Sequence, residues 1–150
     1  MTPLGHAAFS YGVGRGSRRW IPLSLAGVIV GGVLPDVDFV LLWAPQFNAW
    51  HRVITHNLLV CLLAALLAAA WAGRRRGQAH ALAVGLGMAL GGLGHLLTDS
   101  ILDANPSNGL GVAWLWPWSD RVFGPFNLMD LMVWLPAPSN PAAQATGKAP

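Results

Sequence analysis

Four short groups of histidine and aspartate interrupt a chain that otherwise carries few charges. Apolar residues flank most of them, and an ionisable side chain in an apolar segment costs free energy unless it is paired or binds a metal. Imidazole and carboxylate groups are also the ligands that hard and borderline divalent metals prefer. The pattern therefore predicts a metal site whose ligands are drawn from His6, Asp36, Asp38, His51, His56, His95 and Asp99.

Composition indicates a membrane protein. Of the 150 residues, 54% are hydrophobic and only 10% are charged, whereas roughly 25% are charged in an average soluble domain. The formal net charge of +3 comes largely from arginines grouped at the ends of apolar runs, at 15–19 and 74–76. We interpret these groups as cytoplasmic topology anchors, with anionic lipid headgroups as an alternative partner, and not as a surface for nucleic acid.

The acidic residues narrow the chemistry further. All six acids are aspartates, so every mechanism that needs a glutamate base is excluded, including that of the HExxH metalloproteases. The single cysteine, Cys61, lies within an apolar run, which excludes an intrachain disulfide and favours a packing role. Metal-assisted chemistry is the class that the remaining histidines and aspartates favour.

Three apolar stretches must position these residues: 21–43, 53–73 and 79–102. Each is near the roughly 20 residues that a helix needs to cross a bilayer. A fourth stretch, 126–135, is too short to cross unaided, and residues 3–14 predict a short inserted or interfacial helix.

The predicted fold is accordingly all-α: a small polytopic membrane bundle of three to four membrane helices plus a short N-terminal helix. Residues 1–135 would form one membrane-embedded domain, and 136–150, rich in proline and alanine, a disordered tail. The expected location is the inner membrane of a bacterium.

Counting from the arginines places the polar residues at one depth. Asp36 follows Arg19 by 17 positions, His56 precedes Arg74 by 18, and His95 follows Arg76 by 19. In helices these separations correspond to roughly 26–29 Å. Asp99 and Asp103 continue the face of His95, and His6 joins the layer only if residues 3–14 run back towards it. The positive-inside rule puts this layer near the extracytoplasmic face.

The pair His51 and His56 is less regular. Five positions apart, these residues share a helix face poorly, so we expect His51 in the loop that enters the second stretch. Arg52 lies between them, and an arginine beside a metal suits a phosphate or carboxylate substrate. The alternatives are an interfacial arginine and an ion-pair partner of Asp36 or Asp38.

The motifs together resemble a known family. GVLPDVD at 32–38, HR at 51–52 followed by TH at 55–56, and HLLTD at 95–99 resemble the YdjM-like family of inner-membrane metal-dependent hydrolases. The resemblance covers roughly residues 2–120 and includes His6. Asn57 stands where this family usually has serine, and Phe39 where a histidine is common.

The resemblance implies a membrane-bound hydrolase in which a metal-activated water attacks a phosphoester or ester of a lipid-like substrate. Zinc is the expected ion, with manganese or iron as alternatives. Asp36 or Asp103 would orient the water and Arg52 would steady a phosphoryl oxygen, in a membrane whose lipids are the expected partners.

A more distant similarity, to the zinc-dependent phospholipase C and P1 nuclease group, implies that Asp99 bridges two ions. One ion would take Asp36 or Asp38 with His56, His95 and Asp99, and the other His6 and Asp99. Two other functions stay open: a transporter or proton/metal relay that uses the same cluster, and a non-catalytic membrane scaffold with a structural metal site.

Overall fold

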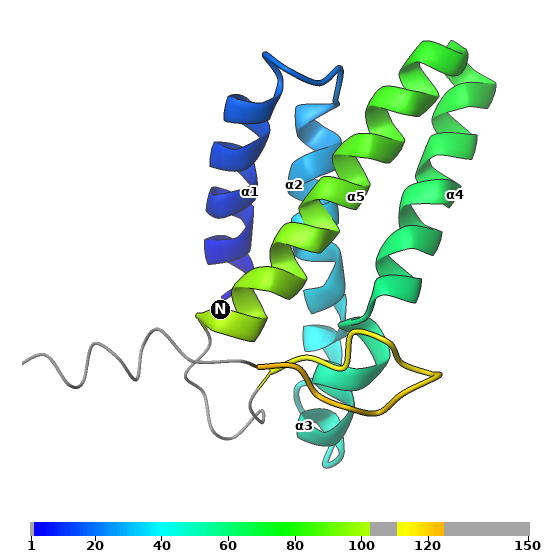
Figure 1. The fold of residues 1–150 in the computed structure, drawn as a ribbon. Coiled ribbons are helices and arrows are strands. Elements are labelled where there is room, and N and C mark those ends of the chain that lie inside the picture. Colours follow the sequence, from blue (N-terminus) through cyan, green and yellow to red (C-terminus); the bar gives the residue numbers. More distant parts are fainter. Residues whose placement is uncertain (1, 103–110, 125–150) are drawn as a thin grey trace, which may run out of the picture.

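The computed structural model describes residues 2–102 and 111–124, and within these ranges the regular elements are helices (Figure 1). They are α1 (Pro3–Ser17), α2 (Leu25–Val33), a 3₁₀ helix η1 (Leu34–Leu41), α3 (Phe47–Trp50), a π-helical turn η2 (His51–Thr55), α4 (Leu58–Arg76) and α5 (Gln78–Ile101). The all-α prediction is therefore confirmed. The predictions for Asp103, for 126–135 and for the tail fall outside the described residues.

The second and third apolar stretches form an antiparallel helical hairpin, α4 and α5 (Figure 1). The two helices have 19 and 24 residues, and both are long and apolar enough to cross a membrane. Gly77 joins them with a φ of 85°, a left-handed conformation that glycine adopts at no steric cost. Arg74–Arg76 end α4, so the arginines mark one end of the hairpin, as predicted.

The first apolar stretch differs from the expected single span. Its α-helix, α2, has only nine residues and is N-capped by Ser24, whose Oγ accepts a hydrogen bond from Gly27 N at 3.1 Å. Pro35 then lies in the first turn of η1. Because proline lacks a backbone N–H and crowds the preceding turn, the chain tightens there into a 3₁₀ helix. This change of helix type brings Asp36 into the interior.

Glycines let α2 pack closely on α5. A Cβ atom added at Gly91 would collide with the carbonyl oxygen of Val28, and one at Gly31 would collide with that of Met88. Small residues permit such backbone contact between membrane helices. On the other side, α1 packs against α2, and a Cβ at Gly32 would collide with the hydroxyl of Ser10. The backbone of α2 is therefore held between α1 and α5.

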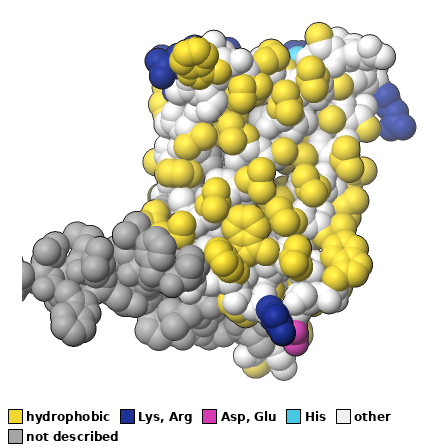
Figure 2. All heavy atoms as spheres, viewed as in Figure 1, with side chains coloured by type: hydrophobic (Ala, Val, Ile, Leu, Met, Phe, Trp, Pro, Cys, Tyr) yellow, Lys and Arg dark blue, Asp and Glu magenta, His cyan; other side chains and the backbone are white. Residues whose placement is uncertain are grey.

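The surface agrees with a membrane environment. Figure 2 shows hydrophobic side chains spread over the height of one face, with arginine side chains at its upper and lower ends. Large apolar residues on the long helices are exposed, among them Leu66, Leu67 and Trp71 of α4 and Leu82 of α5. A lipid environment would cover these side chains.

Candidate metal centre

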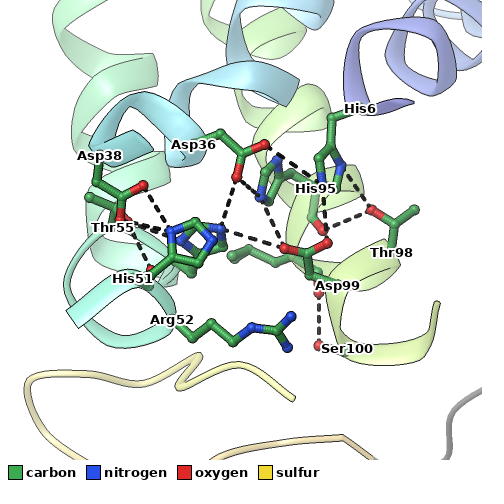
Figure 3. Close-up of polar contacts among 12 residues, drawn as sticks. His6, Asp36, Asp38, His51, Arg52, Thr55, His95, Thr98, Asp99 and Ser100 are labelled. Carbon is green, nitrogen blue, oxygen red and sulfur yellow. Dashed lines mark hydrogen bonds and ion pairs between the residues drawn. The ribbon is translucent and has the colours of Figure 1, made fainter. Parts of the chain in front are cut away.

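Six predicted ligands meet at the end of the bundle opposite the arginine turn (Figures 1 and 3). They come from four parts of the chain, and each is at most 4% exposed: His6 of α1, Asp36 of η1, His51 and His56 of η2 and its C-cap, and His95 and Asp99 of α5. Helix α1 runs so that His6 reaches the interior, which is the direction that the sequence argument required of it.

Asp99 contacts three imidazoles. Its Oδ1 lies 3.0 Å from His6 Nε2, and its Oδ2 lies 3.4 Å from His95 Nε2 and 3.5 Å from His56 Nε2. His95 and Asp99 share one face of α5 at a spacing of four residues, so one helix supplies both a nitrogen and a carboxylate.

Asp36 approaches the same three nitrogens from the opposite side (Figure 3). Its Oδ1 lies 3.4 Å from His56 Nε2 and 3.7 Å from His95 Nε2, and its Oδ2 lies 4.0 Å from His6 Nε2. Two buried carboxylates therefore face three buried imidazole nitrogens.

The remote nitrogens of two of these rings are held by hydrogen bonds. His95 Nδ1 donates to the carbonyl oxygen of Gly32 at 2.7 Å. Thr98 Oγ1 directs its proton to backbone carbonyls of α5, so the nitrogen His6 Nδ1, 3.2 Å away, donates to this oxygen. In the neutral imidazoles, Nδ1 then carries the proton and Nε2 of His6 and His95 is an acceptor.

The third ring follows the same rule. Thr55 Oγ1 donates to Asp38 Oδ2 at 2.8 Å, with the carbonyl oxygen of His51 a further acceptor 3.1 Å away. His56 Nδ1, 3.0 Å from this hydroxyl oxygen, is therefore the donor to it. Nε2 of His56 is an acceptor as well.

Acceptors consequently face acceptors at the centre of the cluster. In the part of the chain that the structure describes, none of these central atoms has a hydrogen-bond partner: His6 Nε2, His56 Nε2, His95 Nε2, Asp36 Oδ1 and Asp36 Oδ2. Buried polar atoms are almost always satisfied, because leaving one unpaired costs about 1–3 kcal/mol. A cation at the centre would satisfy all five. In metal-binding histidines, the ring nitrogen that does not face the metal typically donates a hydrogen bond, as Nδ1 does here.

His51 lies at the edge of the cluster, where Asp38 contacts its ring. His51 Nδ1 lies 2.9 Å and 3.0 Å from the two carboxylate oxygens of Asp38. The expectation of a loop at His51 was wrong, since this residue begins a π-helical turn. A π-helix closes hydrogen bonds between residues five apart, and the rings of His51 and His56 accordingly meet with centroids 4.4 Å apart.

The ligand atoms fall into two overlapping groups. His6, Asp36, His95 and Asp99 form one, and Asp36, His51 and His56 form the other, with the atoms of each group within 4.8 Å of one another. Asp36 belongs to both groups, and Asp99 of the first group also lies 3.5 Å from His56 of the second. Asp38 belongs to neither and instead holds the ring of His51.

Arg52 lies beside the cluster and is 4% exposed (Figure 3). Its Nη1 donates to the carbonyl oxygen of Gly111 at 3.2 Å. Burial lowers the pKa of this guanidinium, while the nearby charges of Asp99 and Asp36 oppose the shift. Because an arginine begins with a pKa above 12, the side chain keeps its charge.

The segment 111–124 runs across the end of the bundle that holds the cluster (Figure 1). Trp114 Nε1 donates to Ser100 Oγ at 2.9 Å, and the carbonyl oxygen of Trp114 accepts from Leu58 N at 3.0 Å. The segment is thereby fixed to the residue that follows Asp99 and to the start of α4.

Sequence reasoning missed the supporting role of Thr55, Thr98 and Ser100. Their signal is position, since each adjoins a predicted ligand in the sequence.

Comparison with known proteins agrees with the resemblance in the motifs. The chain is 35% identical over 138 residues to the inner membrane protein YbcI of Escherichia coli K12, an alignment that covers 87% of this chain and 76% of that protein. No solved structure matches the chain. Residues 1–144 match the family described as YdjM inner membrane protein. The chain therefore belongs to the YdjM family of inner membrane proteins.

Proposed function

We propose that this protein is a membrane-bound hydrolase with a divalent metal centre that acts on a phosphoester or ester of a lipid-like substrate. The observation that carries the proposal is the set of buried, facing atoms without a hydrogen-bond partner in the part of the chain that the structure describes: Nε2 of His6, His56 and His95 and both carboxylate oxygens of Asp36. A structural polar cluster would pair donors with acceptors, whereas a cation site requires this arrangement of acceptors alone.

The donor set fits one or two ions. Imidazole nitrogens together with carboxylates favour zinc, with manganese or iron as alternatives. The two groups provide seven ligand positions in total and share Asp36, so a site for two ions would draw on all six side chains. When bound, such ions lower the pKa of a coordinated water towards about 7 and polarise the bond to be cleaved.

Residues of the chain would then bind the substrate and orient the attacking water. Arg52, charged and adjacent to Asp99 and Asp36, would neutralise a phosphoryl oxygen with its planar set of N–H donors. Of the aspartates in the cluster, Asp36 belongs to both groups and Asp99 contacts three imidazoles. We assign both as ligands that also orient the attacking water, since no glutamate is present to do so.

A groove beside Asp36 supports a lipid-like substrate. It has a volume of about 390 Å³ and is lined, apart from Asp36, by apolar residues of α2 and η1, including Ile29, Val33 and Leu34. Such a groove suits an acyl chain whose polar end reaches the cluster. The positive-inside rule would place this end of the bundle on the extracytoplasmic side of the inner membrane.

The test combines metal analysis with activity. We expect purified protein to contain stoichiometric metal and to hydrolyse a lipid phosphoester or ester, and His95→Ala or Asp99→Ala to lose both. The control for metal content is His80→Ala, because His80 lies at the other end of α5. Wild-type protein without bound metal would disprove the proposal. Metal flux into liposomes without hydrolysis would favour the transporter instead.

A further inference from the structure

A second groove lies at the arginine end of the bundle, away from the metal cluster. It has a volume of about 450 Å³ and is bounded by α2, α4 and α5. Both α2 and α4 pack along α5 but scarcely touch each other, which leaves the groove between them. His80 at its mouth precedes His95 by 15 positions, about 22 Å along α5, so this end of the groove is remote from the candidate metal centre. The apolar end reaches Val30, which also lines the groove beside Asp36.

The groove is apolar inside and cationic at its mouth. Its wall includes Val30, Ala68, Trp71 and Met88, and its end is formed by Arg75, Arg76 and His80. The Arg75 guanidinium lies 5.9 Å from the centre of the Trp71 ring, which holds it over the apolar wall. None of the aspartates that the structure describes lines the groove.

This arrangement matches an amphiphile with a negative head. We infer that the groove binds an anionic phospholipid, with its phosphate at Arg75, Arg76 and His80 and an acyl chain along α2 and α4. Basic pockets between membrane helices favour anionic headgroups on the side where positive residues collect. A helix of a partner protein would leave the cations at the mouth unmatched, and a soluble anion would leave the apolar wall uncovered.

The charge requirement can be tested by native mass spectrometry of the full-length protein in detergent, with dioleoyl phosphatidylglycerol and phosphatidylcholine as probes. We expect one phosphatidylglycerol to remain bound where phosphatidylcholine dissociates. An arginine near a headgroup strengthens binding by about fivefold, so Arg75→Gln/Arg76→Gln should weaken it by roughly 25-fold. Arg74→Gln is the matched control, because Arg74 adjoins these residues but does not line the groove.

A second variant tests the apolar part. Ala68→Phe should fill the groove and displace the lipid while metal content and helicity stay unchanged, and acyl-free glycerol phosphate should not bind measurably. Equal retention of the two lipids would overturn the inference, as would an equal loss in Arg74→Gln and in the double variant. Undiminished phosphatidylglycerol binding by Ala68→Phe would place the lipid elsewhere.

Discussion

His95 donates its Nδ1 proton to the carbonyl oxygen of Gly32 at 2.7 Å, and this bond ties the candidate ligand to the packing of two helices. Gly32 lies in α2, where its Cα faces the Ser10 hydroxyl of α1 without room for a Cβ. The same glycine therefore sets the distance between α1 and α2 and the position of the oxygen that orients the His95 ring.

Gly32→Ala should accordingly destabilise the fold and weaken metal binding together. The added methyl collides with Ser10, and overpacking of this kind costs about 1–3 kcal/mol. Thermal unfolding and metal content measure the two effects. Ser10→Gly should rescue both in the double variant, since it removes the obstructing atoms. Gly12→Ala is the control, because a Cβ there meets nothing within 4 Å. Normal metal binding by a destabilised Gly32→Ala would contradict the coupling.

Thr98→Val should reduce metal affinity with little effect on folding. The substitution keeps the shape of the side chain but removes the oxygen that accepts from His6 Nδ1. Loss of such a supporting hydrogen bond typically costs 10- to 100-fold in metal affinity. Competition with a chromophoric chelator measures the affinity, and Thr98→Ser, which keeps the hydroxyl, should behave like the wild type. Equal affinities of the valine and serine variants would show that the hydroxyl does not orient His6.

The overlap of the two ligand groups at Asp36 predicts how many ions each variant keeps. His51 belongs to one group only, so His51→Ala should retain the ion held by His6, His95 and Asp99. Asp36 belongs to both groups, and Asp36→Ala should lose both ions. Elemental analysis of the purified variants gives the stoichiometry. A single ion in the wild type, lost equally in both variants, would show that the two groups form one site.

The sequence predicted the long elements and the depth of the site better than its local geometry. The α4–α5 hairpin follows from two apolar runs, an arginine turn and Gly77, and counting along regular helices placed His56 and His95 at one level. Such counting assumes 3.6 residues per turn. It therefore could not give the directions of the side chains in η1 and η2, where a 3₁₀ helix and a π-helical turn replace the α-helix.

Asp36 and Asp38 could not be told apart from the sequence for the same reason. In a 3₁₀ helix, residues two apart point in directions about 120° away from each other. The structure turns Asp36 into the cluster and Asp38 towards His51 and Thr55. Which of the two faces the interior depends on Pro35 and on the packing of η1 against η2, which are tertiary features.

Arg52→Lys should separate phosphoester from ester substrates. Lysine keeps the positive charge but lacks the planar set of donors that matches a phosphoryl group. A hydrogen bond between charged groups contributes roughly 1.5–3 kcal/mol, so hydrolysis of a lipid phosphodiester should slow by about 10- to 100-fold while metal content is retained. Hydrolysis of a neutral lipid ester should change little, because no phosphoryl charge needs compensation. Loss of metal in Arg52→Lys would instead assign Arg52 to the structure of the cluster, through its bond to Gly111.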